Sequence, residues 1–246
     1  MDVQEATTCR LPDLKERHLP ENCREAVNTI LKETYGYEQF RNLEIYDDLF
    51  KGKEKLCISQ GQLIENVILE AEEAWKGETK IDNILLTAPT GSGKSMLFQL
   101  PAIYLGKEYN LLTIVVSPLK ALIVDQVESL QELGYMRVAY ASSDLSPEQK
   151  MEVYRQVREG EIDLFYLSPE LLLSYDIKHF VGERRIGLVV VDEAHTVTTW
   201  GKEFRVDYWF LGRYLNTLKQ TLGYSFPLFA LTATAVWNPK GGTDMI

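Results

Sequence analysis

Residues 88–95 read Ala-Pro-Thr-Gly-Ser-Gly-Lys-Ser and follow an apolar run at 84–86 that predicts a buried strand. Residues 96–105 come next and have the pattern of a helix. A glycine-bearing turn between a strand and a helix lets backbone N–H groups converge on a phosphate, and the helix dipole favours the anion. The stretch therefore predicts a phosphate-binding loop, with Ala88 standing where the usual pattern has its first glycine.

The polar residues of this loop have expected roles. Lys94 would reach the β- and γ-phosphates of a nucleotide, and the hydroxyl of Ser95 would hold Mg²⁺. Glycine at two positions allows the backbone to approach an anion where a Cβ would intrude. We expect the cofactor contacts of the loop to come from Thr90, Gly91, Ser92, Gly93, Lys94 and Ser95. An ordinary glycine–serine turn would give Lys94 and Ser95 no such role.

The chain of 246 residues is 45% hydrophobic and 25% charged, as in an ordinary globular protein. Its 26 basic and 36 acidic residues give a net charge of −10, which argues against nucleic-acid binding by overall charge but allows a local basic groove. No apolar run is long enough to cross a bilayer, and the acidic start lacks a signal sequence. We expect a soluble intracellular protein, in the cytoplasm, nucleoid or nucleus, with no membrane partner.

The three cysteines, Cys9, Cys23 and Cys57, all precede the loop at 88–95. Their spacing matches no metal-binding pattern, and an odd number does not suit a disulfide framework. We expect reduced structural thiols.

From residue 84 onward, apolar runs rich in β-branched residues alternate with helical stretches. Strands are expected at 84–86, 111–116, 138–141, 164–167, 188–191 and 228–231, and helices or turns at 96–105, 119–133, 147–159, 169–174 and 206–222. Two earlier helices are expected at 21–34 and 63–75, and an exposed loop at 51–55. Strands that rarely alternate with polar residues are buried on both faces, as in a parallel sheet covered by helices. The pattern predicts one doubly wound α/β domain whose ligand lies at the carboxyl ends of the strands.

Two of these strands end in residues with a chemical role. Asp192 and Glu193 follow the run Val-Val-Val at 189–191, and Mg²⁺ is suited by one carboxylate together with Ser95 and several waters. Asp192 is the metal-side candidate, and Glu193 would orient and deprotonate the water that attacks the γ-phosphate. Thr232 and Thr234 follow the strand at 228–231, where they would hydrogen-bond the acids and couple them to the γ-phosphate. The alternatives are solvated acids at the first strand end and simple packing at the second.

Residues 88–95, 192–195 and 231–235 together resemble the first motor lobe of a superfamily 2 helicase. The resemblance implies a RecA-like P-loop NTPase fold, a mostly parallel sheet with helices on both faces, and ATP with Mg²⁺ as cofactors. It places His195 among the catalytic residues. Residues 117–122, Ser-Pro-Leu-Lys-Ala-Leu, with Asp125-Gln126-Val127 after them, resemble the segment that touches the nucleic-acid backbone in the RecQ family. Residues 166–172, Tyr-Leu-Ser-Pro-Glu-Leu-Leu, resemble the family's second strand-contacting segment. This second resemblance implies nucleic-acid contacts at Ser117, Lys120 and Ser168.

Residues 200–208, Trp-Gly-Lys-Glu-Phe-Arg-Val-Asp-Tyr, are similar to the aromatic-rich loop by which RecQ-type DNA helicases couple single-strand binding to ATP hydrolysis. Stacking on an aromatic side chain contributes about 1–3 kcal/mol per base for any base, and arginine adds stacking and phosphate contacts. Nucleic-acid contacts are therefore expected at Trp200, Phe204, Arg205 and Tyr208. The alternative for Phe204 and Tyr208 is a place in the core of the next helix.

Adenine recognition is where the sequence departs from the family. The resemblance leads us to expect a glutamine after an aromatic–arginine segment, and Glu44 stands at that place, although a carboxylate can only accept hydrogen bonds. Gln62 opens the helix that follows this glutamine in the family, so residues 45–61 are interpreted as an insertion. We expect Tyr37 or Arg41 to stack on the base and Gln62 to contact its edge.

The resemblance covers about residues 35–236, so we divide the chain into a tail and helix at 1–34, a candidate partner contact, and an ATP-binding lobe at 35–246. It also implies a second lobe that supplies an arginine finger, for which the sequence after Thr234 has no room. We therefore expect slow hydrolysis by this chain alone, and as partners single-stranded or forked DNA and a second RecA-like lobe in a longer chain or another subunit.

The leading hypothesis is the first lobe of a RecQ-like, ATP-dependent 3′-to-5′ DNA helicase. One alternative is an RNA helicase or duplex translocase of the same superfamily. The other is a nucleotide-dependent interaction module that does not unwind nucleic acid.

Overall fold

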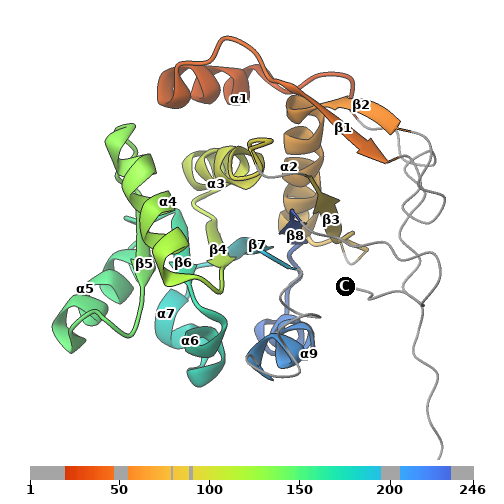
Figure 1. Cartoon of the computed structure of the whole chain (residues 1–246). Coiled ribbons are helices and arrows are strands. Elements are labelled where there is room, and N and C mark those ends of the chain that lie inside the picture. The colour runs from red at the N-terminus through yellow and green to blue at the C-terminus, as the bar shows by residue number, and fades with distance from the viewer. Residues whose placement is uncertain (1–19, 47–54, 79, 89–90, 195–205, 234–246) are drawn as a thin grey trace, which may run out of the picture.

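The computed structural model describes residues 20–46, 55–78, 80–88, 91–194 and 206–233. They form a sheet of six parallel strands with helices on both faces and a separate two-stranded hairpin (Figure 1). None of the described helices is long and apolar enough to cross a membrane.

The six-stranded sheet has the order β3-β8-β7-β4-β6-β5, and each described neighbouring pair is parallel. Its strands are β3 (Ile84–Thr87), β4 (Leu112–Val116), β5 (Val138–Ala141), β6 (Leu164–Leu167), β7 (Ile186–Val191) and β8 (Leu228–Thr232). All of β4, β6 and β7 is buried, as expected for apolar strands covered on both sides. The parallel sheet predicted from the apolar runs is confirmed.

Two layers of helices cover this sheet. The first contains α1 (Glu25–Ile30), a π-helical turn η1 (Leu31–Tyr35), α2 (Gln60–Lys76), α3 (Met96–Tyr109) and α4 (Lys120–Glu132). The second contains α5 (Pro147–Arg158), α6 (Pro169–Ser174), α7 (Ile177–Val181) and α9 (Val206–Leu222). Figure 1 shows the two layers above and below the sheet.

Alternate residues of the central strands pack under different helix layers. Val115 and Val190 pack in the core under the first layer, while Val116 and Val191 pack in the core under the second. Because successive side chains of a strand point to opposite faces, one strand contributes to both cores. This arrangement confirms the doubly wound α/β architecture and leaves the carboxyl ends of the strands along one edge of the sheet.

The hairpin was not predicted. β1 (Asn42–Tyr46) begins before the segment interpreted as an insertion, residues 45–61, and pairs antiparallel with β2 (Lys55–Ser59) inside it. The pairing brings the end of this segment back beside its start. The N–H of Gln60 then donates to the carbonyl of Arg41 at 2.8 Å. The hairpin thus places Arg41 beside the start of α2.

Some helices differ from their predicted bounds, and one was not predicted. α2 begins at Gln60 rather than Leu63, because Ser59 and Gln62 form a capping box that satisfies its first backbone N–H groups. α7 was missed, since it is only 5 residues long, and it begins where the side chain of Asp176 accepts from the N–H of Lys178.

Two of the three cysteines lie in the part of the chain that the structure describes, and both are free thiols. Cys23 is half-buried, and burial together with the nearby Glu65 carboxylate raises the pKa of its thiol to about 12. Cys57 is exposed in β2, and Cys9 lies outside the described residues.

Candidate nucleotide site

The carboxyl end of β8 joins the two segments that were predicted to bind a nucleotide. On one side, the N–H of Ala88 donates to the carbonyl of Thr232 at 3.1 Å. On the other, the N–H of Ala194 donates to the carbonyl of Leu231 at 2.8 Å. The loop after β3 and the acidic end of β7 therefore meet across one intervening strand, at the edge where a doubly wound sheet binds its ligand.

The loop after β3 has the backbone that its glycines permit. Gly91 and Gly93 have φ of +81° and +80°, in the left-handed region that side chains with a Cβ rarely adopt. The Nζ of Lys94 donates to the carbonyl oxygen of Ala88 at 2.9 Å, so this ammonium folds back over its own loop. Ser95 ends the loop and directly precedes α3.

The acidic end of β7 holds its two carboxylates in a strained turn. Glu193 has φ of +51°, which is uncommon for a residue other than glycine and costs roughly 1–3 kcal/mol. Asp192 is only 6% exposed. Its Oδ1 accepts from the N–H of Glu193 at 2.9 Å, and its Oδ2 accepts from Nε2 of Gln126 at 3.3 Å. The fold therefore fixes the orientation of the Asp192 carboxylate.

Opposing effects act on the pKa of Asp192. Burial raises it, and the nearby Glu193 carboxylate raises it further. The hydrogen bonds from Glu193 N–H and Gln126, together with the Lys94 ammonium, act in the opposite direction, and the net result is a raised pKa. The influence of Lys94 on Asp192 agrees with both residues serving one site.

The side chains at this edge fit a magnesium ion. Mg²⁺ keeps several waters and needs only one or two carboxylates, so a hydroxyl such as that of Ser95 and the single carboxylate of Asp192 are suitable ligands. No group of three or more histidine, cysteine or acidic residues gathers within the described ranges. Four buried side-chain polar atoms of the described residues lack a hydrogen-bond partner, and three of them lie around this edge: Ser92 Oγ, Ser117 Oγ and Gln126 Oε1. Unpartnered buried polar atoms are rare and are usually satisfied by water or a ligand.

Tyr37 and Arg41, the predicted base-stacking residues, lie together. The guanidinium of Arg41 lies 5.8 Å from the centre of the Tyr37 ring, and Tyr37 is 45% exposed. Oε1 of Gln62 accepts from the N–H of Ser59 at 3.0 Å, so the acceptor half of its amide belongs to the capping box. Contact of Gln62 with adenine stays a prediction.

Gln60 was missed by sequence reasoning, yet it connects this pair to the phosphate loop. Its Oε1 accepts from the N–H of Arg41 at 3.2 Å, and its Nε2 donates to the carbonyl of Ser92 at 3.0 Å. A Cβ added to Gly93 would lie 2.7 Å from the same Nε2, so the glycine also makes room for Gln60. No local pattern marks Gln60, because its loop contact spans 32 residues of sequence.

The predicted nucleic-acid contacts before α4 and α6 differ in accessibility. Ser117 is 1% exposed, which argues against a direct contact of its hydroxyl with nucleic acid. Lys120 is exposed and pairs with Asp144 at 2.9 Å. Ser168 caps α6 by accepting from the N–H of Leu171. Because β4 and β6 are neighbours, Lys120 and Ser168 follow adjacent strand ends, and their contacts with nucleic acid remain predictions.

Residues 63–240 match the family model described as DEAD/DEAH box helicase. The chain belongs to the DEAD/DEAH box helicase family. The match includes the loop after β3, the acidic end of β7 and the end of β8, which are the three segments that the sheet brings together.

Several relatives of this DEAD/DEAH box domain are named RecQ helicases. The chain is 30% identical over 207 residues to "ATP-dependent DNA helicase RecQ" of Haemophilus influenzae, covering 84% of the chain and 28% of the relative. It is 34% identical over 217 residues to the protein of that name from Synechocystis sp., covering 86% of the chain and 38% of the relative. The chain therefore spans only about a third of the length of such relatives.

Solved structures support the fold of the domain. The DUF1998 helicase MrfA bound to DNA superposes with a TM-score of 0.57 at 22% identity, covering 91% of this chain and 28% of that one. A hypothetical ATP-dependent RNA helicase from Sulfolobus tokodaii has a TM-score of 0.56 at 18% identity, covering 86% of this chain and 51% of that one. At these identities the likeness concerns the fold alone, and it agrees with the expected RecA-like architecture.

Several predicted site residues of this helicase domain lie outside the described parts of the chain: Thr90, His195, Trp200, Phe204, Arg205 and Thr234. Tyr208 falls within α9, but its side chain is not described. The roles expected for these residues stay predictions.

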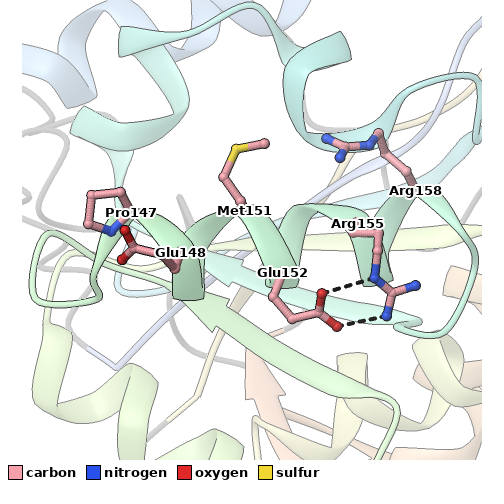
Figure 2. A pocket seen from close by; sticks show the side chains of 6 residues that line it. All are labelled: Pro147, Glu148, Met151, Glu152, Arg155 and Arg158. Carbon is pink, nitrogen blue, oxygen red and sulfur yellow. Dashed lines mark hydrogen bonds and ion pairs between the residues drawn. The ribbon is translucent and has the colours of Figure 1, made fainter.

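A surface hollow of about 570 Å³ lies along α5 (Figure 2). Its lining residues all belong to that helix: Pro147, Glu148, Met151, Glu152, Arg155 and Arg158. No residue of the candidate nucleotide site lines it, and Arg155 is engaged by Glu152 within the hollow at 2.7 Å. The hollow is therefore separate from the site built at the strand ends.

Proposed function

We propose that this chain is the ATP-binding lobe of a RecQ-like, ATP-dependent DNA helicase that couples ATP hydrolysis to movement along single-stranded DNA in the 3′-to-5′ direction. The observation that carries the proposal is the meeting of the phosphate loop and the acidic strand end on the two sides of β8. Membership of the DEAD/DEAH box helicase family and relatives named RecQ support the DNA substrate and the unwinding reaction.

The proposed chemistry divides among a few side chains. Lys94 binds the β- and γ-phosphates, exchanging the carbonyl of Ala88 for phosphate oxygens. Ser95 and Asp192 would hold Mg²⁺, and the bound ion would neutralise part of the negative charge of the phosphates. Glu193 acts as the base that orients and deprotonates the attacking water. Thr232 lies on the strand between the loop and the acids, and its proposed role is to couple the two.

The proposed partners are a second RecA-like lobe and DNA. The match covers only 28% and 38% of these two relatives, so each of them contains further sequence that can form other domains. We propose that one such domain is a second lobe, which would supply the arginine finger. DNA contacts are assigned to Lys120, Ser168 and the aromatic residues of 200–208. We therefore expect slow hydrolysis by the isolated lobe.

Glu193→Gln should leave nucleotide affinity near wild type and slow hydrolysis by about 10²–10⁴-fold, because an amide cannot accept the proton of the attacking water. Single-turnover hydrolysis, with protein in excess over labelled ATP, measures the chemical step even when it is slow. Binding of a fluorescent adenine nucleotide measures affinity in the same samples.

The matched control for this change is Glu132→Gln at the exposed end of α4. It should leave both the hydrolysis rate and the nucleotide affinity unchanged. A Glu193→Gln variant that hydrolyses ATP at the wild-type rate would remove Glu193 from the mechanism. A wild-type chain that binds no nucleotide in the presence of Mg²⁺ would refute the proposed function itself.

Trp200→Ala should leave basal hydrolysis intact and abolish its stimulation by single-stranded DNA. The reason is that the change removes the indole ring on which a DNA base is proposed to stack. The measurement compares ATPase rates with and without single-stranded DNA in a two-lobed protein that contains this lobe. Trp75→Ala, a change of the same kind at an exposed residue of α2, should retain the stimulation. Unchanged stimulation in Trp200→Ala would exclude the aromatic loop as the coupling element.

The nucleic-acid substrate is tested by adding single-stranded DNA, duplex DNA or RNA in that same assay. The proposal expects the largest stimulation from single-stranded DNA. Preferential stimulation by RNA or by duplex would replace the proposed substrate with that nucleic acid. Nucleotide binding without stimulation by any of them would favour an interaction module.

A further inference from the structure

Gln126 lies on α4 and reaches across to the end of β7. It is 9% exposed, and its Nε2 donates to Oδ2 of Asp192 at 3.3 Å, a contact between residues that are 66 positions apart. A carboxylate can only accept hydrogen bonds, so the NH₂ half of the amide must face Asp192 and the carbonyl half must face elsewhere. That carbonyl oxygen, Oε1, is buried and has no partner among the described residues.

A buried amide with an unsatisfied oxygen is costly, because the oxygen has lost its water without gaining a donor, a penalty of about 1–3 kcal/mol. A leucine or methionine at this position would avoid it. The penalty is removed when a donor such as a metal-bound water enters the site. The unsatisfied oxygen of Gln126 therefore points to an occupant of the site rather than to packing alone.

Ser117 provides a second, independent sign of that occupant. β4 and β7 are paired at Val116 and Val191, so the next residues, Ser117 and Asp192, lie side by side at the strand ends. The N–H of Asp192 donates to the carbonyl of Val116 at 2.9 Å, which keeps the two ends in register. Oγ of Ser117 is also buried without a partner. Two unsatisfied polar atoms thus flank the one carboxylate assigned to magnesium.

We infer that Gln126 is a positioning residue for the magnesium ion: its amide N–H holds the Asp192 carboxylate, and its carbonyl oxygen accepts a hydrogen bond from a magnesium-bound water. The inference rests on the proposed function, because it assumes that Asp192 serves a magnesium–nucleotide complex. Residues that orient metal ligands without touching the metal typically change metal affinity about 10- to 100-fold when removed.

Gln126 also connects α4 to the nucleotide site. The helix begins at Lys120, a predicted nucleic-acid contact, and Gln126 is six residues further along it, roughly 9 Å at the helical rise. The hydrogen bond from Gln126 thus links this helix to the Asp192 carboxylate.

The test is the magnesium dependence of nucleotide binding by the 246-residue chain. A fluorescent, non-hydrolysable ATP analogue is titrated at a series of Mg²⁺ concentrations and in EDTA. Gln126→Met keeps the length of the side chain but removes its donor and acceptor, and should raise the Mg²⁺ concentration for half-maximal binding by about 10- to 100-fold. Binding in EDTA should stay at the wild-type level, a pattern that general destabilisation would not produce.

The matched control is Gln131→Met, on the same helix, whose Nε2 meets the carbonyl of Val138 at 3.5 Å, away from the site. It should keep the wild-type magnesium curve. Gln126→Asn serves if the methionine variant does not fold, because its shorter amide cannot reach Asp192 and should shift the curve in the same direction.

A wild-type magnesium curve in a folded Gln126 variant would overturn the inference and leave the proposed function standing. Loss of binding that is equal in EDTA and in Mg²⁺ would also overturn it, since Gln126 would then act on the fold or on the nucleotide. A wild-type chain whose nucleotide binding ignores Mg²⁺ would instead count against the proposed role of Asp192.

Discussion

Asp163→Ala should lower the free energy of unfolding by about 3–5 kcal/mol, because it leaves two arginines and a tyrosine without their common acceptor. Asp163 is fully buried just before β6, at the edge of the sheet opposite the nucleotide site. Its Oδ2 accepts from the hydroxyl of Tyr135 at 2.8 Å and from Nε of Arg137 at 2.6 Å. Its Oδ1 accepts from Nη2 of Arg184 at 2.9 Å.

Arg184 makes this change severe. Its side chain is 3% exposed, and burial lowers its pKa while the charge and hydrogen bond of Asp163 act in the opposite direction. Its other donors go to backbone carbonyls, among them Asn110 at 3.1 Å and Val157 at 3.3 Å. Without Asp163 the guanidinium keeps its hydrogen bonds to backbone carbonyls, but it loses the only carboxylate that pairs with it among the described residues. A cation buried in this way is strongly destabilising.

Urea unfolding followed by circular dichroism measures the loss. Asp144→Ala is the matched control, since Asp144 is exposed and its single ion pair with Lys120 is open to solvent, so its removal should leave the midpoint nearly unchanged. Asp163→Asn keeps the shape and should fall between wild type and alanine. If the free energy of unfolding of Asp163→Ala lay within 1 kcal/mol of the wild-type value, the hydrogen bonds and ion pairs of Asp163 would contribute little to stability.

The parts of the fold that the sequence predicted well are those determined by local pattern. The apolar run at 188–191, predicted as a strand, lies in β7 (Ile186–Val191), which is buried throughout, and such a run has few options other than a strand covered on both faces. The loop at 88–95 was equally clear, because glycine at 91 and 93 is needed where φ is positive. Each of these two signals is contained within a few consecutive residues.

The residues that were missed depend on contacts between distant parts of the chain. Gln126 was noted only within a segment that resembles a nucleic-acid contact, and its hydrogen bond to Asp192 spans 66 residues. Gln60 reaches Ser92 over 32 residues, and nothing near Asp163 distinguishes it from a solvated loop aspartate. The β1–β2 hairpin was missed for a related reason. Its first strand, Asn-Leu-Glu-Ile-Tyr, lies among aromatic and charged residues without a clear period, and its pairing partner begins only at Lys55.

Lys94→Ala should reduce the affinity for ATP by about 10- to 100-fold or more, the loss expected when a hydrogen-bonded charge of about 1.5–3 kcal/mol is removed from a phosphate. The structure gives a reason why the fold should survive. Lys94 is partly exposed, and its ammonium donates to the carbonyl of Ala88 in its own loop, so this contact joins no distant elements of the fold. The positive φ values of Gly91 and Gly93 do not depend on the lysine, so the backbone N–H groups should keep their arrangement.

Titration with a fluorescent adenine nucleotide in Mg²⁺ measures the loss, and urea unfolding of the same variant tests that the domain is intact. Lys107→Ala, an exposed lysine near the other end of α3, is the matched control for the removal of one positive charge and should bind ATP as wild type does. If Lys94→Ala bound ATP as tightly as Lys107→Ala, the charge on the loop would have no role in holding the phosphates. The backbone N–H groups of the loop and the α3 dipole would then have to supply that affinity alone.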